Sequence, residues 1–395
     1  MAEKETIEIL LENAIDWITQ HLYLTFGVLV VLHLGVAWWL KRRPLAVWNS
    51  EPLKVSEVCV DLCLDLEIYI YPIKSLRGSR VSSAVATKYG LKYDRTFMLL
   101  KRTPTGLQNL AVCNHYIMTQ FLTSLTAPTP TTPGTLTITF ISPSGPTVLP
   151  LTIPLEPRVT SLETLDIEMH HSATTAYLMP ETYSAWFTTC FGFDVVLAYL
   201  GENRRDVLFE ELKGSGEKIT FADCAPYLLV SATSLDAVSA LLNDEDGSDT
   251  DAGEERGKEK GKDRKQMDIT KFRPNIVISG AASPWEEDFW SRLLIRHSTP
   301  PSQPIHLRLE HNCVRCRSIN VDYATGKKAQ GKEGEVLKLL QATRRVDEGM
   351  KWSPAFGRYG FWGGGKEEDA RISVGDEVLV TKVNAERTKF SWKLH

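Results

Sequence analysis

The sequence lacks the short motifs that mark the commonest nucleotide-binding and hydrolytic enzymes. It contains no glycine-rich dinucleotide motif, Walker loop, HExxH zinc motif, GxSxG nucleophile motif or paired-carboxylate motif. No segment of the chain repeats another. The function therefore has to be inferred from smaller clusters of residues.

Charge of one sign and cysteine are also scarce. The formal net charge of the 395 residues is -4, which gives no indication of a nucleic-acid-binding surface. The seven cysteines are spread thinly and are odd in number. This usage argues against a disulfide-stapled secreted domain and for a reducing compartment. A chain of this length is expected to form two folded domains with additional segments.

One long hydrophobic run is present, at residues 22–40. Its 19 residues are just long enough to cross a hydrocarbon core of ~30 Å. Aromatic residues flank both ends, an acidic segment precedes the run, and basic residues 41–43 follow at once. By the positive-inside rule, the basic end and everything after it face the cytosol. We expect a tail at 1–21, a transmembrane anchor at 22–40 and a linker at 41–63; a buried core helix is the alternative.

The rest of the chain is dominated by strand signals. Alternating or apolar runs predict strands at 66–71, 93–100, 194–200, 227–231, 272–280 and 304–310. They also predict a hairpin of 136–141 and 147–153 and a strand-turn-strand segment at 372–380. Amphipathic segments predict helices at 182–193 and 234–242. Together these patterns predict a β-rich α+β fold.

Residues 243–268 interrupt this pattern. The segment has an acidic half, a mainly basic half and no aromatic residue. It holds too few apolar residues to offset the entropy lost on ordering. We expect a disordered insertion that can be deleted without loss of the fold.

The turn at 72–78 is the first cluster with candidate chemistry. It follows a predicted strand and holds Lys74, Ser75 and Arg77 before Gly78. A basic turn of this kind suits a phosphate or another anion. A solvated surface loop is the alternative explanation.

The cysteine pair Cys313 and Cys316 is the second cluster, and it lies where the strand predicted at 304–310 should turn. Arg315 and Arg317 flank Cys316, and nearby cations lower a thiol pKa, which favours a metal ligand or a nucleophile. Strand alternation sends the two thiols to opposite sides, so we expect Cys316 to carry the chemistry. A buried cysteine pair is the alternative. A zinc site would need more ligands, and a thioredoxin-like pair would open a helix.

Seven short motifs occur in a fixed order along the chain. They are YPIKSLRG at 71–78, DR at 94–95, FRPN at 272–275, CVRC at 313–316, NVD with TG at 320–326, FGxY at 356–359 and VGD at 374–376. Together they resemble the MOSC superfamily, and within it the mitochondrial amidoxime-reducing components. The resemblance implies an N-terminal MOSC β-barrel-like domain at 64–200 and a MOSC β-barrel domain at 201–395.

The resemblance also implies a molybdenum cofactor, a pterin dithiolene that carries a phosphate. Cys316 would be the protein ligand of the metal, since a thiolate suits a soft metal. Asp223 matches an acidic residue near the metal that can relay protons. An anionic cofactor needs cations and donors from several strands. The matching cofactor-holding positions are Lys74, Ser75, Arg95, Arg273, Asn275 and Arg315.

The chain departs from the family pattern in two places. Residues 112–118 stand where the family has a basic Arg-Gln-x-Pro-type element, and Cys224 and Ala225 replace small hydroxyl residues after the acidic position. Backbone NH groups can still hold the pterin there. We therefore expect the departures to affect substrate choice more than cofactor binding.

The activity implied by the resemblance is reduction of N-hydroxylated compounds with electrons from cytochrome b5 and its NADH-dependent reductase. The chain has no flavin, haem or NADH motif, so it would need such partners. A membrane anchor would raise their effective concentration. The implied location is the mitochondrial outer membrane, with the endoplasmic reticulum membrane as the alternative.

The competing function is a non-catalytic carrier of the cofactor or of its sulfur, held on Cys316. MOSC domains fused to molybdenum cofactor sulfurases suggest this role. No segment of this sequence corresponds to the pyridoxal-phosphate domain of those sulfurases, which favours the reductase.

Overall fold

The computed structural model describes residues 66–142, 148–243, 264–297, 303–364 and 370–393. The expected tail, transmembrane anchor and linker at 1–63 lie outside the described residues. Among the residues that are described, no helix is long and apolar enough to cross a membrane. All of them belong to one compact unit.

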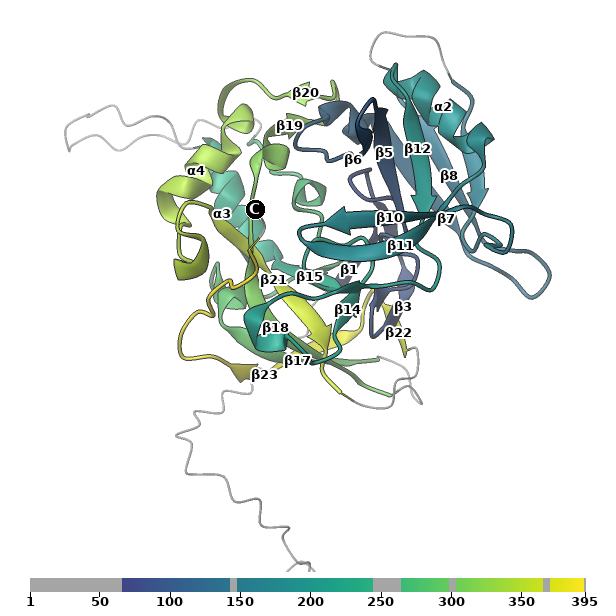
Figure 1. Ribbon diagram of the computed structural model, residues 1–395. Coiled ribbons are helices and arrows are strands. Elements are labelled where there is room, and N and C mark those ends of the chain that lie inside the picture. Colours follow the sequence, from purple (N-terminus) through teal and green to yellow (C-terminus); the bar gives the residue numbers. More distant parts are fainter. Residues whose placement is uncertain (1–65, 143–147, 244–263, 298–302, 365–369, 394–395) are drawn as a thin grey trace, which may run out of the picture. The chain divides into compact units, whose positions relative to one another are not determined.

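A large mixed sheet lies at the centre of this unit (Figure 1). Its order is β2-β1-β16-β15-β21-β18-β17-β23, and each printed pairing is antiparallel except the one between β15 and β16. The strands are β1 (Leu66–Ile70), β2 (Ser79–Val81), β15 (Tyr227–Ser231), β16 (Ile276–Ile278), β17 (Trp290–Arg296), β18 (Ile305–Val314), β21 (Ala355–Trp362) and β23 (Glu377–Val383). Because β1 pairs with β16, the start of the expected N-terminal domain completes the sheet of the second half.

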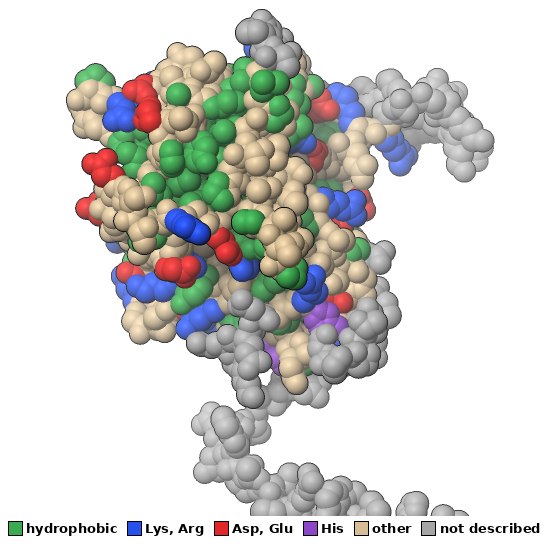
Figure 2. Space-filling view, turned by 90° about the vertical axis from the view of Figure 1, so that its right-hand side faces the viewer, with side chains coloured by type: hydrophobic (Ala, Val, Ile, Leu, Met, Phe, Trp, Pro, Cys, Tyr) green, Lys and Arg blue, Asp and Glu red, His purple; other side chains and the backbone are tan. Residues whose placement is uncertain are grey.

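Two smaller sheets and a helix build the N-terminal half, with orders β10-β11-β12-β5-β6 and β7-β8-β9. Figure 2 shows this face, where hydrophobic side chains gather between scattered charged ones. The elements are β5 (Phe97–Thr103), β6 (Gly106–Asn109), β7 (Phe121–Thr126), β8 (Thr135–Phe140), β9 (Leu151–Pro154), β10 (Thr164–Met169), β11 (Ser172–Leu178), α2 (Glu181–Phe191) and β12 (Val195–Tyr199).

The core of the N-terminal half is aromatic. The ring centroid of Phe121 lies 4.7 Å from that of Phe140 and 4.8 Å from that of Phe191. Helix α2 contributes Phe191 and ends at Gly192, whose φ of 74° is the left-handed conformation that favours glycine after a helix. The helix predicted at 182–193 is therefore confirmed.

The remaining elements surround the central sheet. The helices are α3 (Ala232–Asn243) and α4 (Val336–Thr343). The short strands are β3 (Ser83–Thr87), β4 (Gly90–Leu91), β13 (Arg205–Asp206), β14 (Lys218–Ile219), β19 (Val321–Asp322), β20 (Lys327–Lys328) and β22 (Ala370–Ser373). The 3-10 helices are η1 (Tyr116–Gln120), η2 (Glu210–Leu212), η3 (Ile269–Phe272), η4 (Glu286–Asp288), η5 (Arg317–Asn320), η6 (Gly331–Gly334) and η7 (Glu348–Met350).

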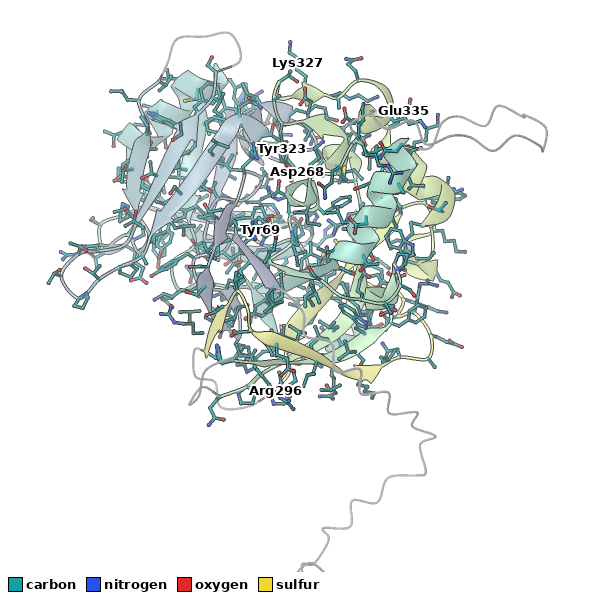
Figure 3. All side chains as sticks on the ribbon, turned by 180° about the vertical axis from the view of Figure 1, so that it is seen from behind. Tyr69, Asp268, Arg296, Tyr323, Lys327 and Glu335 are labelled. Atoms are coloured by element: carbon teal, nitrogen blue, oxygen red, sulfur yellow. The ribbon has the colours of Figure 1, made fainter. Side chains whose placement is uncertain are left out.

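The ends of the predicted insertion at 243–268 are ordered, which corrects its bounds. Asn243 closes α3 and donates from Nδ2 to the Lys265 carbonyl at 2.8 Å. Met267 is only 3% exposed, and the Asp268 carboxylate accepts from the Thr270 NH as the cap of η3. Figure 3 shows Asp268 near Tyr323. The ends belong to the fold because they bury an apolar side chain and cap a helix, and residues 244–263 lie outside the described residues.

The strand-turn-strand segment predicted at 372–380 is confirmed as β22 and β23. The two strands pair with different partners, β22 with β3 and β23 with β17. Periodicity predicts that a segment is extended, whereas the pairing depends on contacts far away in the sequence.

Candidate functional site

A pocket with a cavity volume of about 410 Å³ lies between the two halves of the chain. Every residue that the sequence predicted for the site contributes to its lining. These are Lys74, Ser75, Arg95, Asp223, Arg273, Asn275, Arg315 and Cys316. The structure thus brings together residues that are up to 242 positions apart (316 minus 74), while their individual roles stay predictions.

Backbone hydrogen bonds hold the basic turn against the next strand. The Lys74 NH donates to the Phe97 carbonyl at 2.8 Å, and the Phe97 NH donates to the Pro72 carbonyl at 3.0 Å. The Arg95 NH donates to the Tyr71 carbonyl at 2.8 Å. The side chains of this turn and of Arg95 are therefore fixed at the same end of β1 and β5.

Three of the predicted residues have a left-handed backbone. The φ angles of Ser75, Arg95 and Arg273 are 69°, 48° and 58°. This region is uncommon for residues other than glycine and costs on the order of 1 kcal/mol or more at each position. Such strain concentrates where a fold has to aim side chains at one point.

Among the described lining residues, positive charge exceeds negative charge, with five Lys or Arg side chains and one carboxylate, that of Asp223. Asp94 neutralises Arg95 through a contact of 2.5 Å. No carboxylate of the described residues pairs with Arg273, whose pKa is lowered by burial and further by Arg95. Both guanidinium groups stack on the ring of Tyr71, at 4.4 and 4.5 Å from its centroid. The pocket therefore suits an anion with several acceptor atoms.

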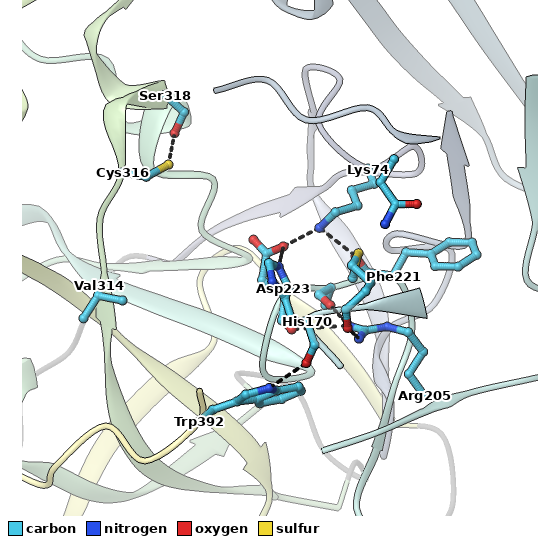
Figure 4. Close-up of polar contacts among 12 residues, drawn as sticks. Lys74, His170, Arg205, Phe221, Asp223, Val314, Cys316, Ser318 and Trp392 are labelled. Atoms are coloured by element: carbon cyan, nitrogen blue, oxygen red, sulfur yellow. Dashed lines mark hydrogen bonds and ion pairs between the residues drawn. The ribbon is translucent and has the colours of Figure 1, made fainter. Parts of the chain in front are cut away.

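Asp223 lies between two donors, Lys74 and His170 (Figure 4). Burial alone would raise the pKa of Asp223, but the charge of Lys74 and the hydrogen bond from His170 outweigh it and hold the pKa well below its usual range. Burial lowers the pKa of Lys74, and Asp223 opposes that change. The carboxylate is therefore ionised at neutral pH.

A fully buried arginine fixes the loop that carries Asp223. Arg205 donates to the carbonyls of Ala222 and Asp223, to the Thr220 carbonyl at 3.2 Å and to the Met169 carbonyl at 2.9 Å. Met169 directly precedes His170 in the chain. The guanidinium of Arg205 therefore holds the backbone beside both Asp223 and His170.

Cys313 and Cys316 both line the pocket but differ in exposure, and strand alternation does not explain the difference because β18 ends at Val314, before Cys316. Cys313 belongs to β18, is 4% exposed and contacts the Tyr359 hydroxyl at 3.1 Å. Cys316 is exposed to the pocket and lies 3.2 Å from the Ser318 hydroxyl. Burial raises the pKa of Cys313. The thiol hydrogen bond from Cys113 lowers the pKa of Cys316 to about 6 against the opposing effect of burial.

The cause of this low pKa differs from the predicted one. Arg315 donates from Nε to the Phe356 carbonyl and from Nη1 to the Phe272 carbonyl, both at 2.8 Å. Arg317 donates to the carbonyl of Cys113 at 2.8 Å. Both guanidinium groups donate to the protein, and the charge of Arg315 opposes the raised pKa of Cys313. The pKa of Cys316 is lowered chiefly by the Cys113 thiol.

Asn275 and Arg315 are tied to the protein backbone. The Asn275 side chain accepts from the Leu228 NH at 3.2 Å and donates to the Tyr69 carbonyl at 3.3 Å. It bridges β15 and β1, just as Arg315 bridges η3 and β21. These bonds hold both side chains in the wall of the pocket, and their role in holding a cofactor stays a prediction.

Cys113 and His170 line the pocket without having been predicted for it. Cys113 lies in the segment 112–118, where the chain departs from the family pattern, and this departure was the only available signal. His170 lies in the turn between β10 and β11, and no local motif marks it. Both approach Cys316 or Asp223 only through the fold.

Two sequence families match the two halves of the chain. Residues 66–194 match the MOSC N-terminal beta barrel domain, and residues 216–379 match the MOSC domain. The chain is a MOSC protein. The β-rich α+β architecture agrees with the fold class predicted from the motifs.

The relatives of this MOSC protein include amidoxime-reducing components. Mitochondrial amidoxime-reducing component 1 of Mus musculus is 24% identical over 361 residues, which cover 89% of this chain and 89% of that protein. Component 2 of Rattus norvegicus is 25% identical over 366 residues, which cover 89% and 90%. A molybdenum cofactor sulfurase of Oryza sativa subsp. japonica is 27% identical over 303 residues, which cover 75% of this chain and 32% of the sulfurase.

Proposed function

We propose that this MOSC protein is a molybdenum-cofactor reductase of N-hydroxylated compounds. The observation that carries the proposal is the exposed thiol of Cys316 at the wall of a pocket with a surplus of Lys and Arg side chains. The relatives named amidoxime-reducing components supply the substrate class, since an amidoxime carries an N–OH group.

The residues present fit such a cofactor. Cys316 would ligate the metal, because a soft metal prefers a thiolate and the pKa of about 6 keeps the thiolate populated at neutral pH. Lys74, Arg95 and Arg273 would hold the anionic pterin phosphate, with the Ser75 hydroxyl as a further donor. Asn275 and Arg315 would keep these groups in place through their backbone contacts.

The bound cofactor would supply a metal that accepts electrons singly and delivers two of them to the substrate. Reduction of N–OH to N–H with release of water also consumes two protons. In the group formed by Lys74, Asp223 and His170, Asp223 is the ionised acceptor, because its pKa is held well below the usual range. Asp223 would orient these donors toward the substrate, which refines its predicted role as a proton relay.

An electron donor is required, and we propose cytochrome b5 with its NADH-dependent reductase. The relatives are named mitochondrial, and the apolar run at 22–40 with basic residues 41–43 suits a single span. The proposed location is the mitochondrial outer membrane with the folded domains in the cytosol; the endoplasmic reticulum membrane is the alternative. Protease added to sealed mitochondria should digest these domains, and full protection would contradict this topology.

Metal analysis combined with an activity assay tests the proposal. The purified full-length chain should contain tightly held molybdenum and should reduce a benzamidoxime-type substrate when cytochrome b5, its reductase and NADH are supplied. Molybdenum without turnover from any donor would contradict the reductase. Zinc in place of molybdenum would contradict the cofactor.

The sulfurase relative favours a second candidate, a non-catalytic carrier of the cofactor or its sulfur. A carrier would release its cargo to an acceptor apoenzyme, whereas a reductase would retain the cofactor through many turnovers. Incubation with a cofactor-free molybdoenzyme distinguishes the two: transfer of molybdenum without N–OH reduction supports the carrier.

A further inference from the structure

Two thiols from opposite halves of the chain meet at the pocket wall. Cys113 lies in the turn between β6 and η1, and Cys316 follows β18. Cys113 is half-buried and Cys316 is exposed, whereas Cys190, Cys224 and Cys313 are buried. Among the cysteines that the structure describes, Cys113 and Cys316 are therefore the two that small reagents can reach.

The side chain of Arg317 fixes the two segments against each other. Its Nε donates to the Cys113 carbonyl at 2.8 Å, and its Nη2 donates to Asn114 Oδ1 at 2.6 Å. Arg317 directly follows Cys316, so these bonds tie the two thiol-bearing segments together at neighbouring residues. Both thiols also line the same pocket. The fold thus holds the two cysteines close together at the pocket wall.

We propose that Cys113 and Cys316 form a disulfide when Cys316 carries no ligand, with a low-molecular-weight disulfide such as oxidised glutathione as the oxidant. The Cys316 sulfur attacks oxidised glutathione, forms a mixed disulfide and releases one glutathione. Cys113 then loses its proton and attacks the Cys316 sulfur, which releases the second glutathione. Two protein thiols are oxidised to one disulfide, and one glutathione disulfide is reduced to two glutathione molecules.

The disulfide has two consequences for the pocket. It joins the turn after β6 to the segment after β18, so it links the two halves of the chain across the site. It also prevents Cys316 from binding a ligand through its thiolate. The disulfide protects Cys316 from irreversible oxidation until a reductant restores the thiols. The inference goes beyond the proposed function, because it holds for any ligand that Cys316 takes.

Peptide mapping of the cofactor-free, full-length chain tests the proposal. The reduced protein is incubated with oxidised glutathione, alkylated and digested without reductant, and its peptides are identified by mass spectrometry. We expect a cross-linked pair of peptides that contain Cys113 and Cys316, with no stable glutathione on either residue. In Cys113→Ser and Cys113→Ala, Cys316 should instead retain glutathione. Cys313→Ser is the matched control and should form the cross-link.

The wild-type result is decisive without any variant. A stable glutathione adduct on Cys316, with Cys113 still open to alkylation, would overturn the proposal. A cross-link from Cys316 to another cysteine would overturn it as well, and so would an unmodified Cys316. Near-ultraviolet circular dichroism of each variant verifies that the pocket remains folded.

Discussion

The arginines around Asp288, and Arg273 at the pocket, use their hydrogen-bond donors in opposite ways. At Asp288, which is fully buried, Arg344 donates to both carboxylate oxygens at 2.8 and 2.7 Å, and Arg387 donates to one at 2.7 Å. Arg358 is also fully buried, and its three nitrogens all donate to oxygens of the protein, among them the Trp290 carbonyl at 2.6 Å. The arginines of this group therefore direct their donors to oxygens of the protein, and we call it the closed group.

Among the described cations of the pocket, Arg273 is open by comparison. Arg273 donates only from Nη1, to the Leu76 carbonyl at 2.6 Å, within the part of the chain that the structure describes. It lies beside Arg95 without a carboxylate of its own, and burial lowers its pKa. A guanidinium whose donors are satisfied by the protein stabilises the fold. One that keeps donors for a cavity is available to an anion.

Asp288→Asn should have the largest effect, because it opens the closed group. Arg344 and Arg387 would lose their shared carboxylate in a buried environment, and removal of one partner of a buried pair costs roughly 3–5 kcal/mol. Urea denaturation followed by tryptophan fluorescence measures the loss. A change of about 0.5 kcal/mol or less, as at a surface position, would show that the group does not hold the fold together.

Arg273→Gln should have the next largest effect, and on a different quantity. The free energy of unfolding of the cofactor-free chain should fall by only about 1 kcal/mol, the worth of one hydrogen bond. The bound molybdenum per folded chain should fall steeply, because an anion would lose a partner. Arg344→Gln is the matched control and should reverse the pattern. Equal loss of stability in the two variants would erase the distinction between the groups.

Cys113→Ala should change a titration without unfolding the protein. The Cys113 thiol stabilises the Cys316 thiolate, so its removal should raise the pKa of Cys316 above about 6. Alkylation of Cys316 by iodoacetamide requires the thiolate, and its pH midpoint should move upward. Cys313→Ala should leave the midpoint in place. An unchanged midpoint in Cys113→Ala would mean that the flanking arginines, and not Cys113, cause the low pKa of Cys316.

Deletion of residues 246–262, with a short Gly-Ser linker, should have the smallest effect. The deletion spares Asn243 and Met267, which belong to the fold. The free energy of unfolding should stay within about 0.5 kcal/mol, and the molybdenum content should not change. Loss of either would mean that the segment packs against the domain.

The sequence predicted the parts of the fold and site that depend on local pattern. Alternation located strands such as β1 and β8, and amphipathicity located α2. The ordered motifs selected residues from both halves, among them Lys74 and Cys316, and the structure places them in one pocket. The motifs identify the site residues because they contain the side chains that carry its chemistry. The sequence need not reveal which strands pair for this to work.

The remainder required three-dimensional contacts. Nothing near Cys113 indicates that it lines the same pocket as Cys316, and nothing near Arg205 indicates that it holds the Asp223 loop. Sequence position favoured Arg315 as the cause of the low thiol pKa, yet its donors are taken by backbone carbonyls that lie about forty residues away along the chain. Local charge therefore indicated the correct thiol for a different physical reason.

Molybdenum content in a pair of cysteine variants tests the central claim most directly. Cys316→Ser and Cys313→Ser are purified as full-length chains, and molybdenum is counted per folded protein. The account predicts that Cys316→Ser loses the metal and the reduction of N-hydroxylated substrates. Cys313→Ser should keep both and lose about 1 kcal/mol of stability, because its thiol is buried against Tyr359. Full molybdenum in Cys316→Ser, or its loss in Cys313→Ser alone, would contradict the account.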